Sequence, residues 1–319
     1  MSSTGSHGWI VGAPVTECHS TRGLIRSFHH SEFPLELLLE RKQENVTVVL
    51  PTREVADTIG PIVESLVALP GLVDQVLVVD AASDDGTAEL AASLGAEVHQ
   101  EAELLPDLGP PLGKGDAMWR ALSVARGKLI AYLDSDTRGF SAHFVTGMLG
   151  PLLLEPDVRF VKGGFRRPFV GRDGHERPTD GGRVTELTAR PLLSAFYPDL
   201  AGFAQPLAGE VAARRELLHQ LPFATGYAVE SSMLLHARDL LGGTSGMAQV
   251  DLEVRRNHHK TLAELGPMAY SVLRVVIDGL RAEGRLLDAE PPPLRTADGR
   301  LVRVEPVERP PFATLLAAA

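Results

Sequence analysis

The stretch Lys128–Thr137, which reads KLIAYLDSDT, decides the fold of this chain. A short apolar run that ends in polar residues predicts a buried strand, typically within a parallel sheet. In an open α/β sheet the ligand crevice lies at the carboxyl ends of the strands, where Asp134 and Asp136 fall. Because side chains alternate along a strand, both carboxylates face one side. The pair suits a divalent cation that phosphate oxygens also hold. An acidic turn that caps the following helix is the alternative.

The composition is that of an ordinary globular protein, with 319 residues, 44% hydrophobic and 23% charged. The net charge of −10 argues against a nucleic-acid partner. Cys18 is the single cysteine, so no intrachain disulfide can form, and a cytoplasmic location is expected. No apolar run reaches the length of a membrane span and no signal peptide is recognisable, so we expect no membrane association.

The first half of the chain alternates strands with helices. Strands are expected at Val46–Pro51, Val76–Asp80 and Ala96–His99, and the helices between them at Ile59–Val67 and Thr87–Leu94. This order predicts an α/β fold with a doubly wound, mostly parallel sheet flanked by helices. Asp80 closes the second strand, as Asp134 follows the strand of the opening stretch.

The remaining elements are less regular. Residues 1–31 are expected to be an arm, and the irregular spacing of His7, His19, His29 and His30 favours solvated loop histidines over a metal cluster. A short helix should follow at Phe33–Arg41. Farther along, the pattern predicts a strand at Val158–Phe165, a mobile polar loop at Gly171–Gly182, a strand at Ala248–Val254, and helices at Phe144–Leu154, Val211–Gln220, Ser231–Leu240 and Leu262–Leu280.

Two glycine-flanked cations are candidate anion sites. Lys114 lies between glycines just before a helix, where backbone N–H groups and the ammonium can meet a phosphate; a flexible surface lysine is the alternative. Gly182-Arg183 opens another helix together with Thr185, which combines N–H groups, a guanidinium and a hydroxyl. The alternative there is a plain glycine turn with a surface arginine. Glu230, at the start of a third helix, is either a dipole partner or a carboxylate that faces the substrate.

Several stretches in this order carry a resemblance to a known family. The chain resembles glycosyltransferases of the GT-A fold, and within them the retaining glucosyl-3-phosphoglycerate and mannosyl-3-phosphoglycerate synthases of actinobacterial type. The likeness spans about residues 45 to 270. It rests on VVLP at 48–51, VVD at 78–80, GKGDAMWR at 113–120, LDSD at 133–136, KGGFRRP at 162–168, GGRVTEL at 181–187, QPLAGE at 205–210 and GYAVE at 226–230.

The resemblance implies a division of labour along the chain. It places the donor against Pro51, Thr52, Glu54, the Asp80 region, Lys114, Asp134, Ser135 and Arg256, and the acceptor against Gly182, Arg183 and Thr185. Asp136, Glu230 and Leu207 form the implied catalytic set. Mg²⁺ or Mn²⁺ would bind Asp136 and His258, with His259 as the fallback, because Asn257 stands at the family's usual histidine. Glu54-Val55-Ala56 replaces the usual Asn-Glu-Glu, which leaves the identity of the donor base open.

The implied reaction moves a hexose from a nucleoside diphosphate sugar to the 2-hydroxyl of 3-phosphoglycerate. GDP-mannose is slightly favoured over UDP-glucose, because the altered segment Thr52–Val55 lies where the base is read. Two rival functions stay open: a sugar-1-phosphate nucleotidyltransferase, and a nucleotide-sugar-binding protein without catalysis. The chain divides into an arm and short helix (1–45), a nucleotide-sugar half (46–180), an acceptor half (181–260) and a C-terminal helix with a Pro-rich tail (261–319). We expect that last part to lie outside the catalytic set and to form a homodimer.

Overall fold

The computed structural model describes residues 25–170, 175–177, 181–256, 260–286, 294–295, 301–302 and 307–316. Its central feature is an eight-stranded sheet with the order β1-β11-β6-β9-β5-β2-β3-β4. All pairings in this sheet are parallel except those of β9 with β5 and with β6. The strands are β1 (Arg26–His29), β2 (Val46–Thr52), β3 (Gln75–Asp80), β4 (Glu97–Gln100), β5 (Leu129–Tyr132), β6 (Phe160–Arg166), β9 (Val211–Arg214) and β11 (Met247–Val254).

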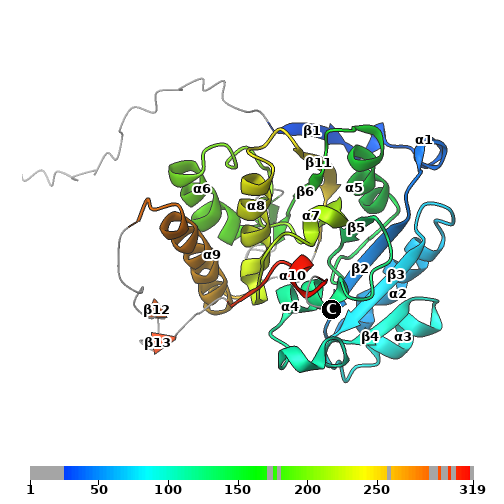
Figure 1. Cartoon of the computed structure of the whole chain (residues 1–319). Helices are drawn as coiled ribbons and strands as arrows, with labels where there is room; N and C mark the ends of the chain where they lie inside the picture. Colours follow the sequence, from blue (N-terminus) through cyan, green and yellow to red (C-terminus); the bar gives the residue numbers. More distant parts are fainter. Residues whose placement is uncertain are drawn as a thin grey trace, which may run out of the picture.

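Helices cover both faces of the sheet, and the two faces have separate cores (Figure 1). Val49 and Ile130 belong to the core that includes α4 and α8, whereas their neighbours Val48 and Ala131 belong to the core that includes α2 and α5. This alternation is the two-residue period of a strand buried on both sides. The helices are α1 (Leu35–Arg41), α2 (Ala56–Val67), α3 (Thr87–Ser93), α4 (Lys114–Ala121), α5 (His143–Leu154), α6 (Arg190–Phe196), α7 (Arg215–Leu218), α8 (Val229–Leu240), α9 (Leu262–Ala282) and α10 (Ala313–Leu316).

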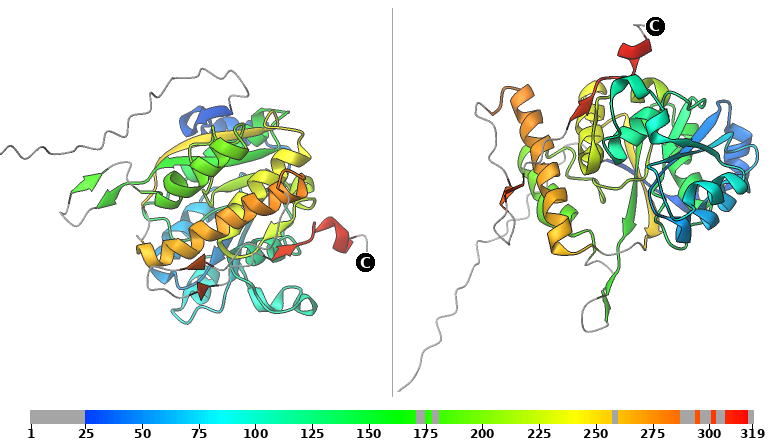
Figure 2. Two further views of the ribbon diagram at one scale, coloured as in Figure 1. Left: turned by 90° about the vertical axis from the view of Figure 1, so that its left-hand side faces the viewer. Right: turned by 90° about the horizontal axis from the view of Figure 1, so that it is seen from below.

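Small strand pairs and single turns complete the described structure. The hairpin of β7 (Phe169–Val170) and β8 (Glu176–Arg177) projects from the body of the molecule (Figure 2). The other strand pairs are β10 (Phe223–Ala224) with β14 (Glu308–Arg309), and β12 (Leu294–Arg295) with β13 (Leu301–Val302). These turns are the short 3-10 helices η1 (His30–Glu32), η2 (Glu101–Glu103), η3 (Pro106–Leu108) and η5 (Gly226–Ala228) and the π-helix η4 (Thr185–Ala189).

The mostly parallel α/β sheet predicted from the sequence is confirmed, but one predicted helix is wrong. Val211–Gln220 is not a helix: Val211–Arg214 forms β9, and only Arg215–Leu218 is helical. The apolar start of this segment fits a strand as well as a helix. Its place between β5 and β6 decides the outcome, because both neighbours supply hydrogen bonds to its backbone.

The N-terminal arm is also shorter than predicted. Arg26–His29 forms the edge strand β1, which pairs in parallel with β11. His29 and His30 are therefore not plain loop histidines: their Nε2 atoms lie 3.9 and 3.3 Å from Oε1 of Glu253. His7 and His19 lie outside the described residues.

The long C-terminal helix is confirmed as α9, with a Thr261 and Glu264 capping box at its start. It crosses the side of the molecule opposite β2, β3 and β4 (Figure 2). It contacts α6, α8 and the short helices η4 and η5. In the part of the chain that the structure describes, no helix has the length and apolar character of a membrane span.

Candidate active site

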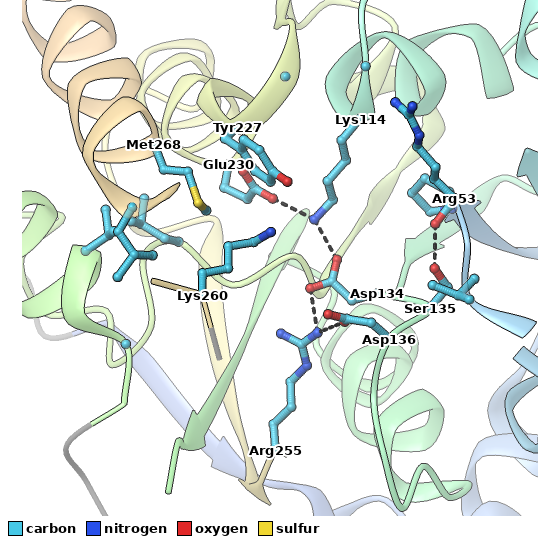
Figure 3. A pocket seen from close by; sticks show the side chains of 18 of the residues that line it. Arg53, Lys114, Asp134, Ser135, Asp136, Tyr227, Glu230, Arg255, Lys260 and Met268 are labelled. Carbon is cyan, nitrogen blue, oxygen red and sulfur yellow. Dashed lines mark hydrogen bonds and ion pairs between the residues drawn. The ribbon is translucent and has the colours of Figure 1, made fainter. Parts of the chain in front are cut away.

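Asp134 and Asp136 lie at the carboxyl end of β5, as the sequence predicts. Oδ2 of Asp134 and Oδ1 of Asp136 approach the same guanidinium nitrogen, Nη2 of Arg255, at 2.9 and 2.6 Å. Figure 3 shows both carboxylates directed at this arginine. Gly209 makes room for the pair, because a Cβ atom at that position would lie 2.1 Å from Oδ1 of Asp134. The acidic pair thus belongs to an ion-paired cluster, whereas the next helix, α5, has Ala142 at its N-cap.

Arg255 is the centre of a buried ionic cluster that the sequence reading missed. Its side chain is only 1% exposed, and its Nε lies 3.1 Å from Oε1 of Glu210, which is equally buried. Burial raises the pKa of Glu210, and the positive charge of Arg255 opposes that rise. Burial would lower the pKa of Arg255, but Glu210 and Asp134 outweigh it and raise that pKa. Arg255 therefore contacts three carboxylates, those of Asp134, Asp136 and Glu210.

Lys114 connects the acidic pair to Glu230. Its Nζ lies 2.5 Å from Oδ1 of Asp134 and 2.7 Å from Oε1 of Glu230 (Figure 3). Burial disfavours the ammonium, but the two carboxylates outweigh it and hold the pKa of Lys114 above its usual value. The same charges have the opposite effect on Asp134: burial would raise its pKa, but Lys114 and Arg255 keep it below the usual range. Lys114 is therefore a cation at neutral pH, not a flexible surface side chain.

Backbone geometry explains why Lys114 points into the site. Gly113 precedes α4 with φ = 87°, a conformation that L side chains rarely adopt. A Cβ atom on the next glycine, Gly115, would lie 2.0 Å from the carbonyl oxygen of Ala224. The two glycines thus let the start of α4 pack closely on the segment before α8, which carries Glu230.

The Gly182-Arg183 turn lies on the other side of the site, near the start of α9. Gly182 has φ = 71°, and Nη2 of Arg183 donates to the carbonyl oxygen of Lys260 at 2.6 Å. The Arg183 guanidinium also stacks over the ring of Phe169 at 5.2 Å. Thr185 follows at the start of η4 with a buried side chain. The guanidinium is therefore held in place from two directions.

The ends of β2 and β3 form the opposite end of the site. The hydroxyl of Ser135 donates to the carbonyl oxygen of Pro51 at 2.7 Å, and the hydroxyl of Thr52 donates to Asp80 at 2.8 Å. Asp80 is fully buried and also accepts from the backbone N–H of Ser83 at 2.9 Å. Its role in the structure is thus to fix the loops after β2 and β3.

One cavity of about 540 Å³ joins these groups. It brings together most of the predicted site residues: Pro51, Thr52, Lys114, Asp134, Ser135, Asp136, Gly182, Arg183, Thr185, Leu207 and Glu230.

Five predicted residues remain: three do not line the cavity, and two lie outside the described residues. Glu54 is exposed beside the cavity and accepts from the backbone N–H of Asp84 at 2.8 Å. Asp80 is fully buried, and Arg256 is paired with Glu176 at 3.0 Å on the surface. The predicted metal ligands His258 and His259 lie outside the described residues.

Comparison with known proteins assigns the family. Residues 47–186 match the family model for glycosyl transferase family 2. The chain is 39% identical over 271 residues to glucosyl-3-phosphoglycerate synthase of Petrotoga mobilis, covering 82% of this chain and 83% of that protein. The chain belongs to the family of the glucosyl- and mannosyl-3-phosphoglycerate synthases.

Solved structures agree with this assignment. Mannosyl-3-phosphoglycerate synthase from Rubrobacter xylanophilus is 48% identical with a TM-score of 0.82, over 91% of this chain and 97% of that one. Glucosyl-3-phosphoglycerate synthase from Mycobacterium tuberculosis, solved with Mn²⁺, UDP-glucose and phosphoglyceric acid, is 34% identical with a TM-score of 0.81, over 91% and 99% of the two chains. The GT-A fold and the family implied by the sequence motifs are thereby confirmed.

The structure also adds residues to the site of this family member. Arg53, Glu101, Arg167, Tyr227, Arg255 and Lys260 line the cavity, together with Leu265, Met268 and Val272 of α9. The sequence analysis placed α9 outside the catalytic set, and in the structure this helix borders the cavity. Its amphipathic pattern signalled a buried apolar face, but only the packing against η4 and η5 shows that part of this face borders the cavity. The sequence signal for Arg255 is the basic segment that it begins, directly before Arg256.

Proposed function

We propose that this chain transfers a hexose from a nucleoside diphosphate sugar to the 2-hydroxyl of 3-phosphoglycerate, with retention at the anomeric carbon. One observation carries the proposal. One cavity is lined both by Lys114, Asp134 and Asp136 around the end of β5 and by the Gly182-Arg183 turn. The relatives are named as synthases of glucosyl- or mannosyl-3-phosphoglycerate, and one of them was solved with Mn²⁺, UDP-glucose and phosphoglyceric acid.

The donor binds with its diphosphate near Asp134 and Lys114. The chemical difficulty is the negative charge that grows on the departing diphosphate, and a fixed cation placed there stabilises the transition state. Lys114 is such a cation, because Asp134 and Glu230 hold it charged and immobile.

The residues present fit a divalent cation. Asp136 lines the cavity with a carboxylate that is 47% exposed and that uses Oδ1 for Arg255, which leaves Oδ2 as a hard oxygen donor. When bound, Mg²⁺ or Mn²⁺ supplies Lewis-acid stabilisation to the diphosphate oxygens. His258, or His259, is the proposed second protein ligand.

Arg183 binds the phosphate or carboxylate of 3-phosphoglycerate, with the N–H groups after Gly182 and the hydroxyl of Thr185 beside it. A planar guanidinium matches such anions with two parallel hydrogen bonds. The acceptor hydroxyl attacks on the face from which the diphosphate leaves. The bond from the anomeric carbon to phosphate breaks, the bond to the glycerate oxygen forms, and the departing phosphate oxygen takes the hydroxyl proton.

Glu230 positions the sugar in this scheme. Its Oε1 is held by Lys114 at 2.7 Å, which favours a fixed binding role over attack on the sugar. Mass spectrometry of the enzyme during turnover tests this assignment. We expect unmodified Glu230, and a glycosyl adduct on this residue would replace front-face attack with a double displacement.

GDP-mannose is the proposed preferred donor. Support comes from the altered segment Thr52–Val55 and from the higher identity to the R. xylanophilus mannosyl enzyme than to the M. tuberculosis glucosyl enzyme. A cytoplasmic homodimer is the proposed working form. The single cysteine is consistent with the cytoplasm, and the exposed Leu187 and Leu262, on elements that contact each other, are candidates for the dimer face. A monomeric mass at micromolar concentration refutes the dimer.

A screen of donors against acceptors tests the function. The chain is incubated with UDP-glucose or GDP-mannose, with Mg²⁺ or Mn²⁺, and with 3-phosphoglycerate, and the products are identified by mass spectrometry and NMR. We expect an α-linked hexosyl-3-phosphoglycerate and no product after chelation of the metal. Pyrophosphate release from a nucleoside triphosphate and a sugar 1-phosphate would instead identify a nucleotidyltransferase. Metal-dependent donor binding without any product would identify a non-catalytic binding protein.

A further inference from the structure

Glu101 is a buried carboxylate whose chemistry the proposed reaction does not use. It follows β4 as the first residue of η2, and it is 1% exposed although it lines the cavity. Its Oε1 is buried and makes no hydrogen bond within the part of the chain that the structure describes. Buried polar atoms are nearly always hydrogen-bonded, so an unpaired one at a cavity wall indicates a missing partner.

The order of the strands places Glu101 at the nucleoside end of the cavity. The diphosphate site is at the end of β5, and the neighbouring strands on that side are β2, β3 and β4 in turn. Pro51, Ala81 and Glu101 line the same cavity at the ends of these three strands. Three strand spacings amount to about 14 Å, which is close to the reach of an extended nucleoside diphosphate from its terminal phosphate to its base. A donor bound as proposed above therefore brings the edge of its base to Glu101.

The chemistry of this edge differs between the two candidate bases. Guanine presents adjacent N1–H and N2–H donors, so both oxygens of an ionised carboxylate can accept from it. Uracil presents one N3–H between two carbonyl oxygens, so one carboxylate oxygen is left against an acceptor, which is unfavourable. A protonated carboxyl group removes this conflict, because its O–H donates to a uracil carbonyl while its C=O accepts from N3–H. The protonated form also pairs with guanine, through O6 and N1–H.

We propose that Glu101 reads the base of the donor, accepting guanine in either protonation state and uracil only when it carries a proton. The inference rests on the proposed function for the position of the nucleotide. Glu101 would then determine the specificity for the donor base. Both guanine and uracil donors would be used, and the preference between them would change with pH.

The charges around Glu101 set where this shift occurs. Burial and the negative charge of Asp116 raise its pKa, whereas the positive charges of Arg120, Arg309 and Arg53 lower it, with a net value of about 7. Asp116 and Arg120 come from α4, Arg309 from β14 and Arg53 from the loop after β2. Asp116 is fully buried and is held by Arg120 at 2.9 Å and by Arg309 at 2.6 Å.

The test compares UDP-glucose with GDP-glucose, two donors that differ only in the base. For the unmodified protein we expect the ratio of kcat/KM values, UDP-glucose over GDP-glucose, to fall about tenfold between pH 6 and pH 8, because the protonated fraction falls by that factor. Glu101→Gln offers one donor and one acceptor at every pH. It should raise the ratio about tenfold at pH 8 and abolish its dependence on pH. A ratio is insensitive to the fraction of each variant that is folded.

Glu103→Gln is the matched control, because it removes the same charge from the same turn at an exposed position. Its ratio should follow that of the unmodified protein. A ratio that does not change with pH, or that is the same in Glu101→Gln, overturns the proposal.

A second readout separates this inference from the proposed function. The dissociation constants of UDP and GDP with Mg²⁺, measured by calorimetry at pH 6 and pH 8, require no turnover. We expect the preference for GDP to grow with pH, and Glu101→Gln to remove that growth. Such a result without sugar transfer would support the role of Glu101 and refute the proposed function. Sugar transfer with a base preference that changes neither with pH nor in Glu101→Gln would support the proposed function and refute the role of Glu101.

Discussion

Replacement of Arg255 by methionine tests whether the buried ionic cluster depends on one guanidinium. The side chain is 1% exposed and its nearest buried partner is Glu210, at 3.1 Å. Removal of one member of a buried ion pair costs about 3–5 kcal/mol, because the other charge is left without compensation. We therefore expect Arg255→Met to lower the free energy of unfolding by about 4 kcal/mol, measured by urea denaturation with tryptophan fluorescence, to which the buried Trp119 contributes.

The double variant Arg255→Met/Glu210→Gln shows whether the stranded charge is the cause. Replacement of a buried ion pair by neutral groups of similar volume is often close to neutral. The double variant should therefore recover at least about 2 kcal/mol relative to Arg255→Met alone. Additive losses would refute the reasoning. Arg256→Met is the matched control, because its ion pair with Glu176 is exposed at the surface and should contribute about 0–1 kcal/mol.

The dependence of this loss on pH follows from the pKa of Glu210. Burial raises that pKa in the folded protein. The ionised carboxylate of Glu210 therefore destabilises the fold above the folded pKa, and this destabilisation disappears as the pH falls below that pKa. Without Arg255, which lowers the pKa, the folded value rises further. The stability lost in Arg255→Met should thus be larger at pH 8 than at pH 5. An equal loss at both values would mean that Glu210 is not the stranded charge.

Three further substitutions probe the reacting groups. Lys114→Met should lower kcat by about 100-fold or more, since a fixed cation at the departing phosphate is lost; an unchanged kcat in steady-state assays contradicts this role. Arg183→Lys should raise KM for 3-phosphoglycerate about tenfold without changing KM for the donor, because the single ammonium of lysine replaces the forked guanidinium; equal effects on both KM values would show that Arg183 does not bind the acceptor. Gly209→Ala should abolish donor binding in calorimetry, since the new Cβ would lie 2.1 Å from Oδ1 of Asp134; normal affinity would show that the segment relaxes.

Local patterns were enough to predict the sheet and much of the site. Three signals lie within a few residues each: the apolar run before Asp134, the glycines around Lys114 and the Gly182-Arg183 turn. Such signals depend on backbone conformation and on strand ends, which short segments determine by themselves. For this reason most of the predicted residues line one cavity.

The sequence by itself thus determined the α/β sheet, the acidic pair at a strand end and the family. Only the tertiary structure decided that Val211–Arg214 is a strand, that α9 borders the cavity and that Arg255 contacts three carboxylates. It also decided that Oε1 of Glu101 lies at the cavity wall without a hydrogen-bond partner among the described residues. The physical reason is that burial and charge pairing depend on neighbours: Arg255 and Asp136 are 119 residues apart in the chain, and only the order of the strands brings them together.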